Sequence, residues 1–457
     1  MQKLSPQDAG FLKLESERCP FHVGGLMLFK LPERASPTYL RQFANRMGRM
    51  NRLWPLFNQQ LSNPDDLANA AWVEATDYRS ERHVLHYALP APGRMADLLA
   101  LVTRAHERPL DKWRPLWELH LIEGLQGERF AVYMKVHHAL LDGVGAMKLL
   151  RSMLATSPDA RINFRKPLES GQREHSGHSL YQQLASLSHG LLEQYRALPD
   201  LARMLSHMGA DVILNKKNKL PLPFTSPHSI LNLELDSSRR VITCELPLSS
   251  VKRIGRQTGG TVNDVLVAIC GGALRRYLLQ QGELPAESLV AGMPVSLKAS
   301  ENEGVGNKLS YLMCPFFTEE VSDLQRLERV IAVTRHGKDE LERVSAAAAM
   351  DYYAMIMVPT ILLTVTGNAT KVRPACNTIL SNVPGSQDTL YLDGAELEAL
   401  YPLSIVTDGM GLNITSVSYA GRLCIAAVSC PARQPGIEAL GKLIRESYRA
   451  LRMAVDA

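Results

Sequence analysis

Apolar and polar residues alternate along residues 129–138, whose sequence is RFAVYMKVHH. The apolar side chains occupy the even positions Phe130, Val132, Met134 and Val136. Alternation with a period of two is typical of a β-strand, in which successive side chains point to opposite faces of a sheet. His138 shares the parity of the apolar row and His137 does not, so we expect the two adjacent histidines to have different roles.

Patterns with the helical period of 3.6 residues occur elsewhere in the chain. They predict helices over residues 94–107, 144–154 and 261–278, and the last of these begins with the helix-start residues Thr261, Asn263 and Asp264. Residues 412–430 form two runs around an Ala-Gly pair, which indicates a β-hairpin. A chain of 457 residues with this mixture is expected to form two domains of helices and strands.

A change of composition near residue 166 predicts a linker between these domains. Apolar residues recur at spacings of three and four from Leu180 to Leu198, which predicts an amphipathic helix that ends near Pro199. Residues 215–229 are rich in Lys, Pro and Ser and indicate an extended loop. We therefore expect an N-terminal domain at residues 1–165, a helical and extended linker at 166–228, and a C-terminal domain at 229–457.

The least polar segment, residues 352–370, contains no charged side chain. Its length approaches that needed to cross a bilayer, but Pro359 lies within it, and Thr, Gly and Asn dilute its second half. This composition favours a buried helix or the wall of a tunnel over a membrane span. Partial insertion into a membrane surface stays open as an alternative.

Charge and cysteine content narrow the class of protein. The formal net charge of +5 is too small to indicate nucleic-acid binding by itself. Most of the surplus of positive charge lies in the predicted linker. It either forms a solvated face or attracts anionic lipid headgroups or a phosphate-bearing substrate. The seven cysteines form no CxxC pair, and acidic residues interrupt the apolar run that a signal peptide would need, so we expect a protein of the reducing cytoplasm.

A metal site, a buried core position and a catalytic site are the three alternatives for the two histidines. Side chains on opposite faces of one strand cannot easily share a metal ion, and no neighbouring Cys or Glu completes a tetrahedral set, so no metal site is expected. A buried neutral imidazole is the expected state of His137, whereas burial and proton acceptance stay equally open for His138. Asp142 and Gly143 form a turn before the next helix, where Asp142 can cap backbone N–H groups or pair with an arginine.

The spacing HHxxxDG at residues 137–143 resembles the motif of the bacterial wax ester synthase/diacylglycerol acyltransferase family. Similar segments run along most of the chain: LSPQDAGFLKLE, FHVGGLMLF, RPLWE, TVNDV, MPVSL, SNVPG and LNITSVSYAG. Phe21 departs from the Met of many members, and SNVPG lacks the second proline that often follows it. The resemblance implies an α/β (α+β two-layer) fold of two chloramphenicol acetyltransferase-like domains with mixed sheets, joined by a helical crossover linker, with an active-site tunnel at their interface.

The resemblance also implies roles for individual residues. It makes His138 the general base, Asp142 a structural residue of the motif loop, and Gly143 the residue that leaves room for acyl-CoA. His137, which strand parity separates from His138, is expected to be its structural support. Asn263 is a candidate for stabilising an oxyanion, with capping of the helix as its alternative role.

Two further residues, Trp117 and Thr360, are candidates for the tunnel wall, and Trp117 is alternatively a core residue. The implied reaction transfers a fatty acyl group from acyl-CoA to a long-chain alcohol or to diacylglycerol. No covalent acyl-enzyme is expected, because a GxSxG nucleophile motif is absent.

Acyl-CoA is a substrate in this reaction, so no cofactor is implied. The products would be wax esters and triacylglycerols, and the resemblance implies peripheral association with the inner membrane surface or with lipid inclusions. The sequence does not indicate the oligomeric state. Two alternatives stay open: a condensation-domain-like acyltransferase that uses carrier-protein donors, and a catalytically silent relative that binds lipid.

Overall fold

The computed structural model describes residues 2–141, 143–160, 206, 208, 219–297 and 308–457. They form two compact units. The first unit comprises Met1–Glu174, Val383–Ile405 and Ser416–Ala426, and the second comprises His175–Asn382, Val406–Thr415 and Ala427–Ala457. The predicted fold class of two units with mixed sheets is confirmed. Most of the predicted linker at 166–228, including its amphipathic helix, lies outside the described residues, so those domain bounds stay a prediction.

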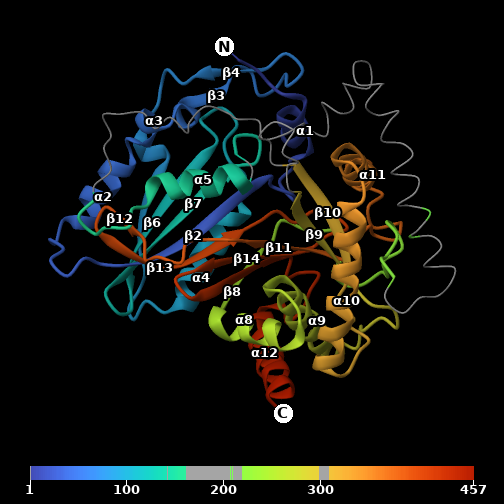
Figure 1. The fold of residues 1–457 in the computed structure, drawn as a ribbon. Coiled ribbons are helices and arrows are strands. Elements are labelled where there is room, and N and C mark those ends of the chain that lie inside the picture. Colours follow the sequence, from blue (N-terminus) through green and yellow to red (C-terminus); the bar gives the residue numbers. More distant parts are fainter. Residues whose placement is uncertain (1, 142, 161–205, 207, 209–218, 298–307) are drawn as a thin grey trace. The chain divides into compact units, whose positions relative to one another are not determined.

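A six-stranded mixed sheet forms the centre of the first unit (Figure 1). Its strands, in spatial order, are β12 (Tyr391–Leu392), β13 (Ala395–Leu403), β2 (His22–Lys30), β7 (Arg129–His137), β6 (Trp117–Leu125) and β5 (Val84–Ala88). β5 is parallel to β6, whereas β7 is antiparallel to both of its neighbours. The alternating segment of the sequence is therefore a central strand, and all of its residues after Arg129 are buried.

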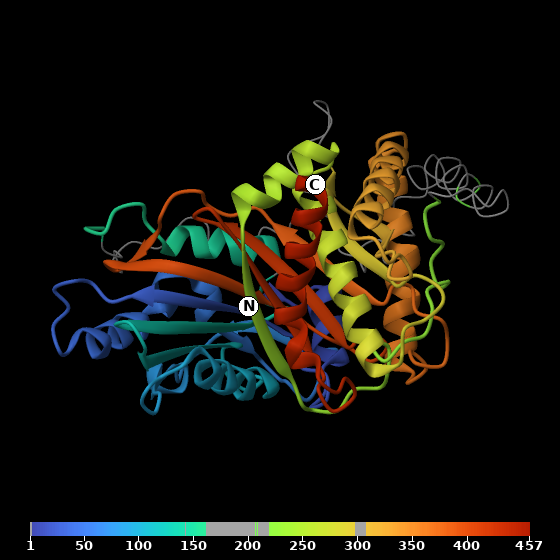
Figure 2. The same cartoon turned by 90° about the horizontal axis from the view of Figure 1, so that it is seen from below.

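Helices cover both faces of this sheet. α4 (Met95–Glu107) and α5 (Gly143–Met153) lie on opposite faces (Figure 2). The remaining elements are α1 (Pro6–Leu14), α2 (Tyr39–Met47), α3 (Met50–Leu53) and a small sheet of β1 (Gln2–Lys3), β4 (Ala71–Glu74) and β3 (Gln59–Leu61). α1 begins with a capping box in which Ser5 and Asp8 bond to each other's backbone N–H, as its sequence favours.

Strand β13 comes from the C-terminal half of the chain and completes the first unit. It pairs antiparallel with β2, from Glu396 opposite Lys30 to Leu403 opposite Gly24. The turn before it is anchored by an ion pair between Asp393 and Arg46 of α2. β2 would otherwise end the sheet with unpaired backbone groups, so β13 protects an edge. Domains made of consecutive residues, as predicted from the sequence, do not include this contribution of a C-terminal strand to the first unit.

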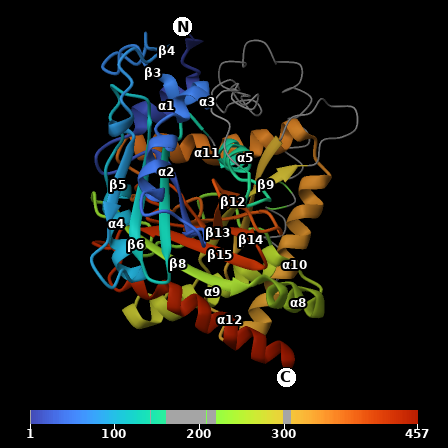
Figure 3. The same ribbon diagram turned by 90° about the vertical axis from the view of Figure 1, so that its left-hand side faces the viewer.

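The second unit contains another six-stranded mixed sheet, part of whose hairpin β14–β15 is counted with the first unit. Its strands, in spatial order, are β10 (Lys308–Pro315), β9 (Val290–Leu297), β11 (Thr378–Val383), β14 (Leu412–Tyr419), β15 (Arg422–Ser429) and β8 (Arg240–Pro247). The helices among its described residues are α8 (Leu248–Thr258), α9 (Val262–Gln281), α10 (Asp323–Glu342), α11 (Ala346–Val365) and α12 (Leu440–Asp456). α9 packs against α10 and α12, while α11 packs against β10 (Figure 3).

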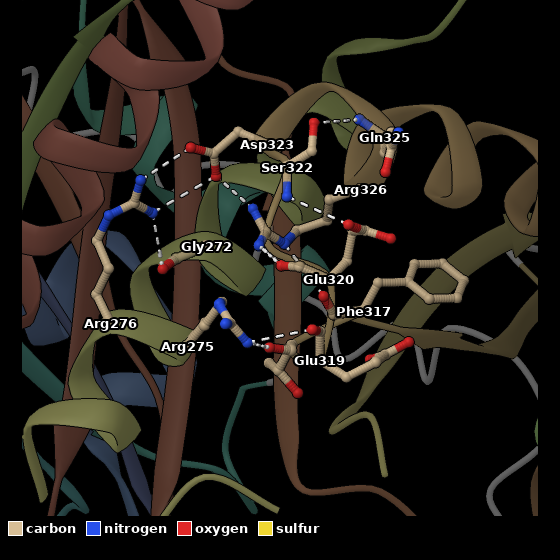
Figure 4. A network of polar contacts seen from close by, with 11 residues as sticks. Gly272, Arg275, Arg276, Phe317, Glu319, Glu320, Ser322, Asp323, Gln325 and Arg326 are labelled. Carbon is tan, nitrogen blue, oxygen red and sulfur yellow. Dashed lines mark hydrogen bonds and ion pairs between the residues drawn. The ribbon is translucent and has the colours of Figure 1, made fainter. Parts of the chain in front are cut away.

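A network of arginines ties α9 and α10 to the loop that follows β10 (Figure 4). The guanidinium of Arg326 is buried and donates to the carbonyl oxygens of Phe317 and Glu320 and to the carboxylate of Asp323. Arg276 of α9 binds the same carboxylate at 2.8 Å. A buried guanidinium is tolerated only when its donors are satisfied, so this network fixes the loop and the start of α10 together.

Most local predictions are confirmed. The helices predicted at 94–107 and 261–278 are α4 and α9, and the predicted hairpin is β14–β15. Its two turn residues, Ala420 and Gly421, both have positive φ, as a tight hairpin turn requires. The apolar segment at residues 352–370 is helical up to Val365, in α11. The buried-helix alternative is wrong, whereas the tunnel wall and partial membrane insertion stay predictions. Only 22% of the window Ala348–Val365 is buried.

Candidate functional site

His138 is the first residue after strand β7, in the turn that leads to α5. Its backbone N–H donates to the carbonyl oxygen of Phe21 at 2.8 Å and so extends the pairing of β7 with β2. Its imidazole lies against the ring of Phe11 from α1, with the ring centroids 4.6 Å apart, and the residue is half-buried. Because the strand ends at His137, the turn and not strand parity sets the direction of His138.

His137 has no exposed surface, and one nitrogen of its ring accepts a hydrogen bond. Its Nδ1 accepts the backbone N–H of Ala139 at 3.0 Å, which places a ring proton on Nε2. Nε2 lies 3.5 Å from Oε1 of Glu15. The ring therefore lies between the motif turn and Glu15, an arrangement that suits the structural role predicted for His137.

Glu15 is not among the site residues predicted from the sequence, although it ends the family-like segment LSPQDAGFLKLE. Its Oε1 accepts the backbone N–H of Phe21 at 3.1 Å, and its Oε2 lies 3.1 Å from Nζ of Lys112. Burial raises the pKa of this carboxyl, but His137, Lys112 and the Phe21 N–H together hold the pKa below its usual value of 4.5. Glu15 thus carries a negative charge at neutral pH and fixes both chain segments that contact His138.

The face of β7 that carries His137 is polar although it is buried. Nζ of Lys135 donates to the carbonyl oxygens of Ala105 and Arg108 at 3.0 and 2.5 Å, and lies 3.4 Å from Oε2 of Glu118. Burial lowers the pKa of this lysine, and the Glu118 carboxylate opposes that shift. The ammonium group satisfies carbonyls at the C-terminal end of α4, where a positive charge is favourable.

A second pair of contacts joins the same face to α4. Nε2 of His22 binds the carbonyl oxygen of His106 at 2.9 Å, and Nδ1 of His106 binds the hydroxyl of Tyr133 at 2.7 Å. The Tyr133 ring crosses Gly24 of β2 so closely that a Cβ there would lie 2.5 Å from a ring carbon. Burial lowers the pKa of His22, with a further contribution from Lys135, so His22 is neutral. These groups form a rigid layer beneath the motif strand.

The remaining predicted residues of the first unit have different positions. Asp142 lies outside the described residues, so its role in the motif loop stays a prediction. Gly143 is the first residue of α5. Trp117 is fully buried, donates from Nε1 to the carbonyl oxygen of Phe57 at 2.9 Å, and stacks on His83. These contacts favour the core alternative for Trp117 over a tunnel wall.

Asn263 belongs to the second unit, at the second position of α9. The helix is capped by Thr261, whose side chain accepts the N–H of Asp264. The Asp264 carboxylate in turn accepts the backbone N–H of Thr261. The alternative prediction, that Asn263 caps the helix, is therefore wrong. Instead, Oδ1 of Asn263 accepts a hydrogen bond of 2.6 Å from Nδ2 of Asn382.

Thr360 lies in the C-terminal half of α11. Its hydroxyl donates to the carbonyl oxygen of Ile356 at 2.7 Å, and the residue lines a small hollow in the second unit together with Met357, Leu363 and Cys376. The role of Thr360 in a tunnel wall stays a prediction. Among the residues that the structure describes, no group of three or more His, Cys, Asp or Glu side chains could hold a metal ion.

Family comparisons agree with the motifs along the chain. The family model described as wax ester synthase/diacylglycerol acyltransferase catalytic domain matches residues 4–266, and the model of the WS/DGAT C-terminal domain matches residues 305–452. A Mycobacterium tuberculosis (strain H37Rv) protein named as a probable diacylglycerol O-acyltransferase is 36% identical, over 100% of both chains. The O-acyltransferase WSD of Acinetobacter baylyi is 33% identical over 96% of this chain and 94% of its own.

Solved structures extend the comparison to the fold. The wax ester synthase/diacylglycerol acyltransferase from Marinobacter aquaeolei VT8 is similar with a TM-score of 0.79 and 31% identity, over 100% of both chains. A starter condensation domain of rhizomide synthetase has a TM-score of 0.58 at 16% identity, over 100% of this chain and 95% of its own. The second likeness concerns the fold alone.

Replacing Glu15 by Gln tests the network that holds the motif turn. Gln cannot be ionised, so we expect the free energy of unfolding at neutral pH to fall by about 1–3 kcal/mol. The lowered pKa of Glu15 stabilises the folded protein above the ordinary value of 4.5, and this contribution is lost as the pH falls through the folded pKa. The difference between wild type and variant in urea unfolding should therefore narrow below about pH 4.5.

Glu17→Gln is the matched control, because Glu17 is exposed on the same segment. A constant difference between wild type and Glu15→Gln down to about pH 3 would contradict the ionised state assigned to Glu15.

Proposed function

This chain belongs to the wax ester synthase/diacylglycerol acyltransferase family, and we propose that it moves a fatty acyl group from acyl-CoA to a long-chain alcohol or a diacylglycerol with His138 as general base. The protein is an acyltransferase by its family. The observation that carries the proposed mechanism is the split between the two motif histidines. The His137 ring is fully buried between the Ala139 N–H and Glu15, whereas His138 is half-buried at the end of the strand, with its ring against Phe11.

In the proposed reaction, His138 takes the proton of the acceptor hydroxyl while that oxygen attacks the thioester carbonyl of acyl-CoA. The carbonyl oxygen then carries a negative charge, and Asn263 is our candidate for the donor that stabilises it. Collapse of the tetrahedral intermediate breaks the carbon–sulfur bond, and the histidinium returns its proton to the CoA thiolate. The cycle needs no covalent acyl-enzyme and no cofactor, and its products would serve as stored neutral lipids.

The rest of the motif has a supporting part in this proposal. Asp142 would shape the loop between His138 and α5, and Gly143 would leave space for acyl-CoA beside the base. Glu15 and Lys112 act through His137 and are positioning residues. The Phe11 ring beside His138 supplies an apolar surface, which suits a lipid hydroxyl and limits water as a competing acceptor.

His138→Ala tests the general base. With palmitoyl-CoA and hexadecanol, we expect the variant to release CoA about 10²–10⁴ times more slowly, with little change in KM for palmitoyl-CoA. All seven cysteines are buried, so a thiol reagent can follow CoA release from the folded protein with little background. His228→Ala, at an exposed histidine of the second unit, is the control.

A His138→Ala variant that kept most of the activity while His228→Ala was normal would reject the base assignment. Acyl carrier protein in place of CoA as the donor tests the condensation-like alternative, which no described contact favours.

Thr360→Ile tests the proposed tunnel wall. The substitution adds an apolar branch at the hollow, so we expect the rate with hexadecanol to fall relative to that with shorter alcohols such as decanol. Thr364→Ile is the matched control, because Thr364 lies one turn further along α11, makes the same type of hydroxyl-to-carbonyl bond and does not line the hollow. Unchanged ratios of rates across alcohols for Thr360→Ile would remove Thr360 from the substrate channel.

Lipid substrates also require contact with a lipid surface, and α11 is the segment that we propose for it. The window Ala348–Val365 is long and apolar enough to cross a membrane by length and composition, yet most of it is not buried. Leu362 and Val365 are 60% and 63% exposed. A helix that is apolar on all sides normally buries itself, so an unburied one fits peripheral insertion at the inner membrane surface or a lipid inclusion.

Leu362→Asp combined with Val365→Asp tests this contact. We expect flotation with vesicles of phosphatidylcholine, phosphatidylglycerol and diacylglycerol to fall at least about tenfold, because each side chain contributes roughly 1.5 kcal/mol or more when it leaves water. The control variant is Leu279→Asp combined with Met453→Asp, which changes two exposed apolar residues on α9 and α12. An equal loss of flotation in both variants would contradict a specific role of α11.

A further inference from the structure

Asn263 has one side-chain group in use and one available. Its Oδ1 accepts from Asn382, and no other hydrogen bond of its side chain is found among the described residues. The residue is half-buried, and none of the described residues is recorded as a partner of its Nδ2. An amide has an acceptor oxygen on one side and a donor nitrogen on the other, so the bond to Oδ1 decides which side Nδ2 occupies.

The surroundings of Asn263 also favour donation. It is at the second position of α9, where the helix carries a partial positive charge and its first N–H groups have no intrahelical partner. Thr261 and Asp264 already satisfy the cap, and the second oxygen of Asp264 accepts from Thr334 at 2.7 Å. The start of the helix is therefore held by its cap, and the donor Nδ2 of Asn263, for which no partner is found among the described residues, suits an oxygen that gains negative charge.

Asn382 is well placed to fix this amide, because it lies on strand β11, which is anchored at its start. Asn377, immediately before the strand, is fully buried, accepts the N–H of Val290 at 2.8 Å and donates to the carbonyl oxygen of Pro227 at 2.7 Å. The hydroxyl of Thr378 donates to the carbonyl oxygen of Leu412 at 2.6 Å. A strand held in this way keeps the position of Asn382 constant.

We propose that Asn382 is a positioning residue that sets the amide of Asn263, so that Nδ2 of Asn263 donates to the substrate carbonyl oxygen during acyl transfer. This inference rests on the proposed function, in which Asn263 stabilises the oxyanion. It assigns a task to the SNVPG segment and explains why an amide, with both a donor and an acceptor, stands at each of the two positions.

Asn382→Asp reverses the polarity of the contact at almost constant shape. The carboxylate can only accept, so Asn263 turns its Nδ2 toward residue 382 and presents Oδ1 to the substrate. We expect kcat with palmitoyl-CoA and hexadecanol to fall about 10²–10³-fold, as for loss of one oxyanion donor, with KM for palmitoyl-CoA changed less than about threefold. Asn382→Ala leaves Asn263 free to rotate, and we expect a smaller loss of about tenfold.

The double variant Asn263→Ala with Asn382→Asp separates positioning from an independent role. If Asn382 acts only through Asn263, the double variant is no slower than Asn263→Ala alone. Losses that multiply would overturn the inference, and so would near-normal kcat in Asn382→Asp when Asn263→Ala is impaired. Full activity of Asn263→Ala would reject the oxyanion donor of the proposed function and the inference with it. Thermal unfolding of each variant shows whether a loss reflects misfolding, and Asn382→Ala then provides the test without an added charge.

Discussion

The buried carboxylate of Glu15 is the interaction on which the motif turn depends. It binds the N–H of Phe21, the ammonium group of Lys112 and the ring of His137. A buried charge without partners would cost several kcal/mol, so these contacts must form together. Because the Phe21 carbonyl holds the N–H of His138, one carboxylate fixes the chain on both sides of the proposed base. The two histidines differ for this reason, since the His137 ring accepts the Ala139 N–H and lies against Glu15, whereas the His138 ring lies against Phe11 in a half-buried residue.

The polar layer on the same face of β7 extends this support. Lys135, His22 and Tyr133 are buried and contact α4 or its C-terminal carbonyls. Polar groups buried in this way are satisfied only in one arrangement of strand and helix, so they specify the register of β7 more narrowly than apolar packing would. Such rigidity beneath the turn suits a group that must meet a hydroxyl and a carbonyl at hydrogen-bond distance.

The second unit combines buried, hydrogen-bonded polar groups with an exposed apolar helix. Side-chain networks around Asn377 and Arg326 satisfy buried polar groups and hold strand β11 and the start of α10. α11, in contrast, leaves apolar side chains in contact with water. An enzyme for lipid acceptors needs both properties, because chemistry requires fixed donors and substrate capture requires an apolar surface. The family membership and the exposed helix therefore both suit the lipid acceptor that we propose for this protein.

The sequence by itself determined the local elements and the family. Alternation located β7, the cap residues and helical period located α9, and the Ala-Gly pair located the β14–β15 hairpin, because these signals depend only on neighbouring residues. Only the tertiary structure decided the contacts of Glu15 with His137, of Asn382 with Asn263, and of β13 with β2. The tertiary structure also showed that most of the apolar run of α11 is not buried, whereas Trp117 is fully buried. These facts depend on packing between segments far apart in the chain, where periodicity and capping carry no information.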